Sequence, residues 1–300
     1  MNITFRQLRV FVQLFELRSF TATAQALHMT QSAVSKLCSE LETEVGFPLF
    51  ERSTRHVEPT DGASDLYVYA VELLGTLDSA TRSLSDLSST RKGNVGIAAA
   101  PMIFYALLCD VMTGYQRQYP HVRLETYEVS TDMAIDHVVT GRVDFGLVAI
   151  DRAEPRLLIE PVFHDALCLA CPPLHPLVED GCPVSWERLT REKLIMLRSD
   201  NNMGRMVDSI MRRYDVDFRA PVEVGAVSTM LGLVRAGAGI AVVSTYISRC
   251  ADAFGIHIVP IADSADTVRT LSLIRRRNAR SSVAAAKFIE IMRADLQGSQ

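Results

Sequence analysis

Between residues 21 and 45 the hydrophobic positions recur at helical spacing in two blocks, which a short polar corner separates. The first block predicts a helix over residues 21–27. The second predicts a helix that begins at Gln31 with Thr30 as its N-cap, because the threonine hydroxyl can accept a hydrogen bond from an otherwise unpaired backbone N–H. The apolar face of this second helix must be buried, and it consists of Val34, Leu37, Cys38, Leu41 and Val45.

The opposite face of the second predicted helix is polar and carries little charge. Amide, hydroxyl and ammonium groups near a helix N-terminus suit the edges of base pairs in a DNA major groove. We therefore predict that this face reads DNA. An ordinary helical hairpin, with its polar face in solvent, is the alternative that these residues alone leave open. The predicted DNA-reading residues are Thr30, Gln31, Ser32, Ser35, Lys36 and Ser39.

A β-hairpin is predicted next. Residues 47–60 hold β-forming side chains on both sides of a polar tip at Ser53, Thr54 and Arg55. We interpret them as a short two-stranded wing, from which Arg52 and Arg55 reach phosphates or the minor groove. A hairpin that is merely solvated is the alternative.

Residues 60–89 predict one long helix in which hydrophobic residues alternate spacings of four and three. In a single helix this heptad seam of apolar side chains would be exposed to solvent. The simplest partner that could cover it is the same helix of a second copy. The resulting two-fold homodimer would present two reading helices to successive major-groove faces, which predicts a pseudo-palindromic site in double-stranded DNA. Packing of the helix against its own chain is the alternative. The predicted dimerisation residues are Leu66, Ala70, Leu73, Leu77, Ala80, Leu84 and Leu87.

Beyond the polar residues 88–94 the chain alternates predicted strands with predicted helices, which is typical of an α/β fold with mainly parallel sheets. The pattern predicts two lobes with two crossings between them, because the last strand and helix complete the first lobe. Lobe I comprises residues 93–161 and 266–300, and lobe II comprises residues 162–265.

Two such lobes leave a cleft at the carboxyl ends of their strands, where several predicted loops meet. Three loops place a pair of hydroxyl side chains at the start of a helix, where free N–H groups and the helix dipole favour an anion such as a carboxylate. We expect a small organic acid as effector; a role of the same hydroxyls as N-caps alone is the alternative. The candidate effector-binding residues are Pro101, Met102, Ser130, Thr131, Val148, Arg198, Ser199, Ser228, Thr229 and Ser244.

Several dispersed motifs resemble those of the LysR-type transcriptional regulators. They are LRVF at 8–11, SFTATAQALHMTQSAVSK at 19–36, LETEVGFPLFER at 41–52, Thr60 at the start of a long helix, GRVDFGL at 141–147, PLHPL at 173–177 and VRAGAGIAVV at 234–243. The resemblance implies an all-α winged helix-turn-helix with a long linker helix, followed by a two-lobed effector domain similar to periplasmic solute-binding proteins. It also implies homotetramers made as dimers of dimers, and contact with RNA polymerase if the protein is an activator.

The sequence departs from the family pattern at a few positions. Thr23 and Ser32 stand where Ala and Pro are frequent, Pro59 stands where Leu is usual, and Gly62-Ala63 reverses the customary order. The last two departures concern the junction of wing and long helix. The expected domains are a winged helix-turn-helix over residues 1–59, a linker and dimerisation helix over 60–92, and an effector domain over 93–300.

Composition limits the possible functions. The chain has 300 residues, a hydrophobic content of 48% and a formal net charge of −4, so it is globular and has no overall attraction for nucleic acid. Any attraction for phosphate must be local. No phosphate loop, metalloprotease pair or nucleophile elbow is present, which favours a regulator over an enzyme. A cytosolic small-molecule sensor that acts through protein partners is the alternative function.

The cysteines and the hydrophobic runs indicate a reduced, aqueous compartment. Six cysteines are scattered along the chain. His164, Cys168, Cys171 and His175 have spacings that zinc can use, but residues three apart on a strand point to opposite faces, so we expect no metal and no cofactor. No secretory signal or membrane span is recognised. We expect a cytoplasmic protein.

Overall fold

The computed structural model describes residues 2–52, 57–88, 93–150, 152–214, 222–262, 269–277 and 279–298. The chain forms two compact units. The first is Met1–Leu87 with Val139–Arg142, and the second is Ser88–Val138 with Val143–Gln300.

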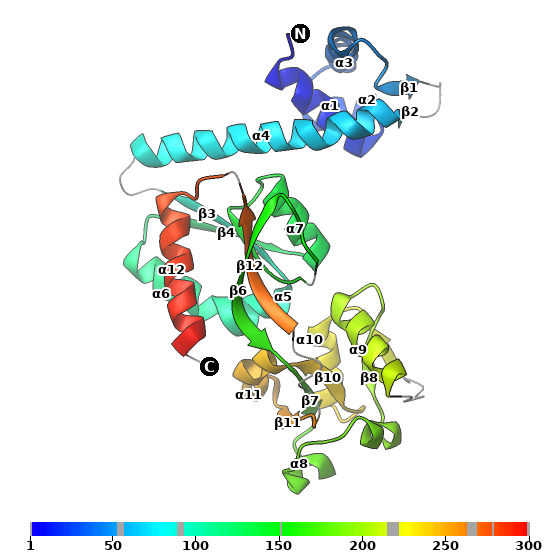
Figure 1. Ribbon diagram of the computed structural model, residues 1–300, viewed down its shortest axis with the longest axis vertical. Helices are drawn as coiled ribbons and strands as arrows, with labels where there is room; N and C mark the ends of the chain where they lie inside the picture. The colour runs from blue at the N-terminus through cyan, green and yellow to red at the C-terminus, as the bar shows by residue number, and fades with distance from the viewer. Residues whose placement is uncertain are drawn as a thin grey trace. The chain divides into compact units, whose positions relative to one another are not determined.

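The first unit is a helical domain with a small hairpin (Figure 1). Each of its first three helices begins at a hydroxyl N-cap: Thr4, Ser19 and Thr30 accept hydrogen bonds from backbone N–H groups in the first turn. Gly46 ends the third helix in the left-handed conformation. The elements are α1 (Phe5–Leu17), α2 (Phe20–Ala26), α3 (Gln31–Val45), β1 (Phe50–Arg52), β2 (Val57–Pro59) and α4 (Asp61–Ser88).

The core of this unit lies between α1, α3, the wing base and the first half of α4. Phe15 of α1 stacks on Tyr67 of α4 with 4.2 Å between ring centroids, and the Tyr67 hydroxyl donates to Glu16. These contacts fasten α4 to the helices before it. The buried members of the cluster are Leu8, Phe11, Leu14, Cys38, Leu41, Leu49, Phe50, Ala63, Ala70 and Leu74.

The predicted dimerisation seam on α4 is not one continuous surface. Ala70 is buried in the core of its own chain, so the prediction is wrong for this position, and Leu66 is partly covered because it packs against the same core. The cause is the short helices before α4, which cover its first half. Leu73 is 53% exposed, and Ala80 is exposed as well. Leu77 is partly covered, and the side chains of Leu84 and Leu87 lie outside the described residues.

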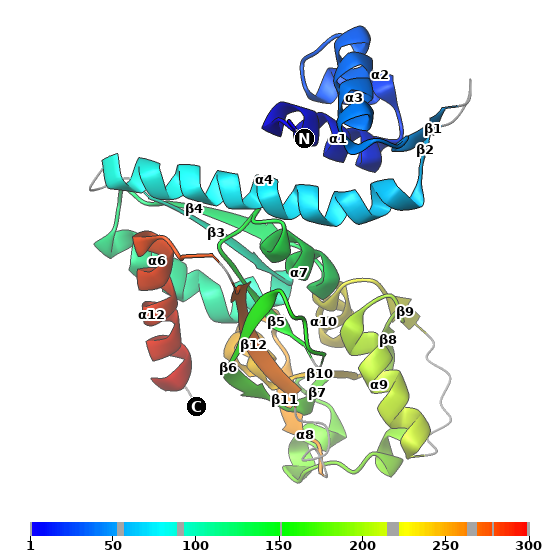
Figure 2. The same cartoon turned by 45° about the horizontal axis from the view of Figure 1, so that its top comes forward.

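The second unit begins with lobe I, whose five-stranded sheet has the order β4-β3-β5-β12-β6. The α12 helix packs beside α6 (Figure 2), where the Tyr115 hydroxyl donates to the carbonyl of Ala284 at 3.0 Å. The predicted return of the chain to this lobe is confirmed. The elements are β3 (Asn94–Ala99), α5 (Pro101–Ile103), the π-helix η1 (Phe104–Leu108), α6 (Cys109–Gln118), β4 (Arg123–Glu128), α7 (Thr131–Val139), β5 (Phe145–Ala149), β6 (Leu157–Asp165), β12 (Arg269–Arg276) and α12 (Val283–Gly298).

Lobe II contains a three-stranded sheet of order β10-β7-β11 and the parallel pair β8-β9. Leu194 beside β8 bridges Ile240 beside β10, so the two groups of strands adjoin. The elements are β7 (Leu167–Cys171), α8 (Pro176–Asp180), η2 (Glu187–Arg191), β8 (Ile195–Leu197), α9 (Asn202–Arg213), β9 (Val222–Val224), α10 (Val227–Arg235), β10 (Ala241–Ser244), η3 (Thr245–Cys250), α11 (Ala251–Phe254) and β11 (His257–Pro260).

The expectation of mainly parallel sheets is wrong for the strands that carry the chain between the lobes. β6 leaves lobe I and β12 returns to it, so the two pair antiparallel. β7 enters lobe II and β11 leaves it, and they also pair antiparallel. Within the described residues no helix has both the length and the hydropathy that a membrane span requires.

Candidate functional sites

The polar face of α3 is the first candidate site. Val34, Cys38 and Leu41 are fully buried on one side of the helix, so the other side must face away from the core. Thr30, Gln31, Ser32, Lys36 and Ser39 are exposed, and Ser35 is partly covered. The predicted division of the helix into two faces is therefore present in the structure.

The exposed row on α3 continues one turn further than the sequence prediction. Ser32, Lys36 and Ser39 follow the helical spacing of four and three, and Thr43 is the next member of that row. Thr43 is exposed and donates its hydroxyl to the carbonyl of Ser39 at 2.8 Å. Continuing the spacing beyond Ser39 would have identified it.

Lys36 is only loosely held within the chain. Its Nζ lies 3.9 Å from Oε1 of Glu40, and both side chains are largely exposed. An exposed pair of this kind contributes little to stability. The ammonium can therefore exchange Glu40 for a phosphate or a base edge at small cost.

The wing is attached at its base to α3 and α4. Oε1 of Glu42 accepts the N–H of Leu49 at 2.9 Å and that of Phe50 at 3.2 Å. From the other side, the Thr60 hydroxyl donates to the carbonyl of Pro48 at 3.0 Å. Arg52 belongs to β1, but its side chain is outside the described residues, as is Arg55 at the tip.

The reversed Gly62-Ala63 pair fits the junction of wing and α4. Ala63 is fully buried in the core. A Cβ at position 62 would lie 2.4 Å from the ring of Phe47, so a larger residue there would require this exposed ring to move. Thr60 caps α4 by accepting the N–H of Ala63. The departure from the family pattern is thus accommodated without loss of the helix start.

The candidate effector residues of lobe I divide into two groups. Pro101, Ser130 and Thr131 stand at the starts of α5 and α7, directly after the carboxyl ends of β3 and β4, where the prediction placed them. Met102 and Val148 belong to the hydrophobic core, with 6% and 1% of their surface exposed. Core packing holds both side chains, so the prediction that they line an open site is wrong.

In lobe II, Arg198 and Ser199 follow β8 and are exposed, and Ser228 and Thr229 are exposed in the first turn of α10. The residue before α10 is Ala226, so no side chain caps the first N–H groups of that helix. The Arg198 guanidinium lies across Gly225, since a Cβ there would be 2.7 Å from Nη2.

The two lobes are in contact at the carboxyl end of a lobe I strand, β5. Asn202 opens α9 in lobe II, and its Nδ2 donates to the carbonyl of Ala149 at the end of β5 in lobe I, at 3.4 Å. The loop of Arg198 directly precedes α9. The carboxyl end of β5 and the start of α9 are therefore neighbours.

Ser244 does not belong to this group, and its prediction is wrong. It is fully buried and accepts a hydrogen bond from Arg269. Arg269 Nε in turn donates to Asp165 at 2.7 Å, and Asp165 also accepts the N–H and the hydroxyl of Thr245. Ser244 is occupied by this polar cluster, which joins the two crossings between the lobes.

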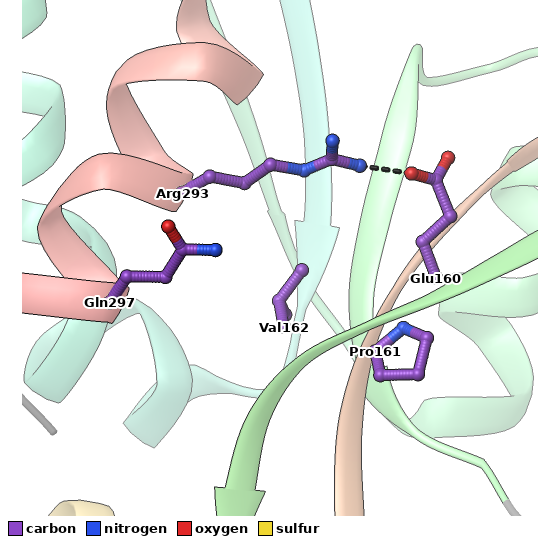
Figure 3. A pocket seen from close by; sticks show the side chains of 5 residues that line it. All are labelled: Glu160, Pro161, Val162, Arg293 and Gln297. Carbon is purple, nitrogen blue, oxygen red and sulfur yellow. Dashed lines mark hydrogen bonds and ion pairs between the residues drawn. The ribbon is translucent and has the colours of Figure 1, made fainter.

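A separate pocket of about 160 Å³ lies between β6 and α12 (Figure 3). Glu160 in its wall accepts hydrogen bonds from Arg275 and Arg293. Burial by itself would raise the pKa of Glu160, but the two guanidinium groups outweigh it and lower that pKa. The pocket contains none of the candidate effector residues, and its charged groups are already paired.

The two thiols of β7 are buried, and this burial opposes their ionisation. Burial raises the pKa of both Cys168 and Cys171 to about 12, so neither forms a thiolate near neutral pH. In the part of the chain that the structure describes, no three His, Cys, Asp or Glu side chains are grouped as metal ligands.

A winged helix-turn-helix joined to a two-lobed α/β domain defines the class of ligand-responsive DNA-binding regulators. The LysR substrate binding domain matches residues 88–297, and the bacterial regulatory helix-turn-helix protein of the lysR family matches residues 5–64. The chain therefore belongs to the LysR family of transcriptional regulators, and its C-terminal part is an effector-binding domain.

Relatives match over nearly the whole chain. The uncharacterized HTH-type transcriptional regulator YfeR of Shigella flexneri is 27% identical over 297 residues, covering 98% of this chain and 94% of that protein. The HTH-type transcriptional regulator BenM of Acinetobacter baylyi is 29% identical over 261 residues, covering 86% and 85%.

Solved structures share the fold. Full-length BenM gives a TM-score of 0.61 at 26% identity, covering 99% of this chain and 98% of that one. Full-length CbnR in complex with its target DNA gives a TM-score of 0.63 at 19% identity, covering 98% and 100%.

Proposed function

We propose that this LysR-type regulator binds a pseudo-palindromic site in double-stranded DNA and adjusts transcription in response to a small organic acid. The observation that carries the DNA role is the exposed polar face of α3, opposite a fully buried apolar face. Ser32, Lys36 and Ser39 are the central readers, with Thr30, Gln31 and Ser35 at the edge of the face. Arg52 and Arg55 of the wing hold phosphates.

Two copies assemble through the part of α4 that its own chain leaves open. Val68, Tyr69 and Leu73 are large apolar side chains that are 46%, 65% and 53% exposed. Covering them requires a partner surface, and a second α4 helix supplies one. The dimer pairs two reading helices, and dimers assemble further into a homotetramer. Contact with RNA polymerase follows if the protein is an activator, and the site of action is the cytoplasm.

An organic acid suits the candidate effector groups because the described loops supply hydrogen-bond donors and a positive charge. The first N–H groups of α10 have no side-chain cap, and Ser228 and Thr229 stand beside them. Arg198 lies next to this helix start, and Ser130 and Thr131 open α7 in lobe I. Helix N-termini and an arginine favour a carboxylate.

The DNA role is tested by selecting a binding site from a random-sequence duplex pool and comparing it with a scrambled duplex. The double variant Ser35→Ala/Lys36→Ala should discriminate less between the two duplexes. We expect the ratio of its affinities for the selected and the scrambled duplex to fall by about tenfold, because a hydrogen bond to a base edge is removed. Glu290→Ala on helix α12 of the second unit is the control. Unchanged discrimination in the double variant would remove the reading role from α3. Binding without salt dependence would favour a sensor that acts through protein partners.

The effector class is tested by thermal unfolding of the full chain in the presence of small organic acids. A ligand that binds only the folded state stabilises it, by about 2.7 kcal/mol at a hundredfold excess over Kd. Arg198→Ala and Ser228→Ala should abolish the shift, whereas Arg212→Ala on the exposed side of α9 should not. If only neutral or cationic ligands stabilise the chain, the organic-acid assignment is wrong.

A further inference from the structure

Glu42 connects the reading helix to the wing. It is partly covered, near the C-terminal end of α3, where the chain turns at Gly46 and comes back as β1. A single carboxylate oxygen, Oε1, accepts the N–H groups of Leu49 and Phe50 at 2.9 and 3.2 Å. Hydrogen bonds to an ionised acceptor are stronger than neutral ones. The start of β1 is thereby attached to α3 itself.

The hairpin has little cohesion of its own. Each strand has three residues, and a lone two-stranded hairpin is marginal in water. Its first pair is Phe50 with Pro59, and proline has no N–H to donate to the ladder. Its second pair sets Glu51 opposite Glu58, and like charges in that position are destabilising. The position of the wing therefore depends on what holds its base.

Two side chains supply that support from opposite directions. Glu42 of α3 accepts the N–H groups of Leu49 and Phe50, and Thr60 at the start of α4 donates to the carbonyl of Pro48. The side chains of Leu49 and Phe50 are buried and also resist displacement. Glu42 and Thr60 thus hold the wing base by side-chain hydrogen bonds, and Glu42 belongs to the helix that would enter the groove.

We infer that Glu42 is a positioning residue for DNA binding, which sets the wing at a fixed distance from the reading face of α3. This inference rests on the proposed DNA role. The carboxylate acts through the N–H groups of Leu49 and of Phe50, the first residue of β1, and this strand continues to Arg52. When the wing is held, its arginines meet phosphates at the same time as α3 meets the bases. When it is released, the arginines no longer reach the phosphates, but base reading remains.

The inference and plain electrostatics predict opposite signs for one substitution. Glu42→Ala removes a negative charge close to DNA, which by itself should strengthen binding. Loss of wing position should weaken it. Glu44→Ala is a matched control, because Glu44 is an exposed acid on the same helix whose carboxylate contacts only the N–H of Asn2 among the described hydrogen bonds.

The experiment measures binding of the full chain to a mixed-sequence duplex of about 30 base pairs over a range of salt concentrations. We expect Glu42→Ala to bind about threefold to tenfold more weakly than Glu44→Ala, with a salt slope smaller by about 1 for each phosphate that the wing no longer binds. Glu42→Gln keeps an oxygen acceptor and should retain the wild-type slope. Thermal unfolding verifies that each variant is folded.

If Glu42→Ala does not fold, Glu42→Asp gives the same test without a change in charge, because its carboxylate is one methylene too short to reach both N–H groups. Equal affinity and equal slope for Glu42→Ala and Glu44→Ala would overturn the inference. So would a Glu42→Gln variant as weak as Glu42→Ala, because the amide oxygen would then fail to replace the carboxylate. If the wild-type chain shows no salt-dependent binding, the proposed DNA role fails instead.

Discussion

At the scale of single residues, the turn of the helix-turn-helix depends on an unusual backbone conformation. His28 has a φ of +51°, in the left-handed region that side chains with a Cβ adopt at a cost. Two backbone hydrogen bonds close the end of α2, from the N–H of His28 to the carbonyl of Gln25 and from the N–H of Met29 to the carbonyl of Ala24. The chain leaves α2 through His28 and reaches Thr30, the N-cap of α3, two residues later.

We predict that His28→Val lowers the free energy of unfolding by about 1–2 kcal/mol, because a β-branched side chain is least tolerant of positive φ. His28→Gly should be neutral or stabilising by up to about 1 kcal/mol, since relief of strain offsets the greater entropy of the unfolded chain. Denaturant unfolding measures both. His121→Val, at an exposed turn residue outside the left-handed region, is the control. Equal losses at the two sites would contradict the prediction.

At the scale of elements, α4 serves two purposes on two sides. Ala63, Ala70 and Leu74 face the core of the N-terminal unit and are buried. Tyr69 and Leu73 face away from it. A heptad pattern alone does not distinguish a side covered by the same chain from one covered by a second copy, because both are apolar.

We predict that substitutions on the two sides of α4 have different consequences. Leu73→Glu should shift the protein towards monomers with the N-terminal unit still folded, because the charge is placed where a partner helix packs. Ala70→Glu should unfold that unit, because it buries a charge in the core. Light scattering and thermal unfolding separate the two results. A Leu73→Glu chain that stays fully oligomeric would exclude this side of α4 from the interface.

At the scale of the whole molecule, a buried ion pair joins the two crossings between the lobes. Asp165 ends β6 and is 1% exposed, and Arg269 begins β12. The pair also holds Ser244 and Thr245 at the end of β10. This cluster therefore connects the two crossings between the lobes. An effector can shift the equilibrium between two arrangements of the lobes only by binding them unequally.

We predict that Asp165→Ala lowers the stability of the effector-binding unit by about 3 kcal/mol or more, because it leaves the Arg269 charge partly buried and unpaired. Asp132→Ala removes an exposed partner of Arg152 at 3.1 Å and should cost about 1 kcal/mol or less. Thermal unfolding of the full chain measures both. Equal, small effects would mean that the cluster does not support the junction of the lobes.

The sequence determined much of this protein by itself. The helix α3 begins at Gln31 behind the cap Thr30, and the two faces of α3 divide as predicted. These features depend on residues within about four positions of one another, so periodicity and capping chemistry reveal them.

The tertiary structure alone decided the rest. Met102, Val148 and Ser244 are buried, and Ala70 is buried in the core of its own unit. Glu42 forms a hydrogen bond with the backbone at the base of the wing. Each outcome depends on a partner distant along the chain, as in the Asp165–Arg269 pair, whose members are 104 positions apart. A local pattern shows that a residue is apolar or polar, but the identity of its partner is a property of the packed fold.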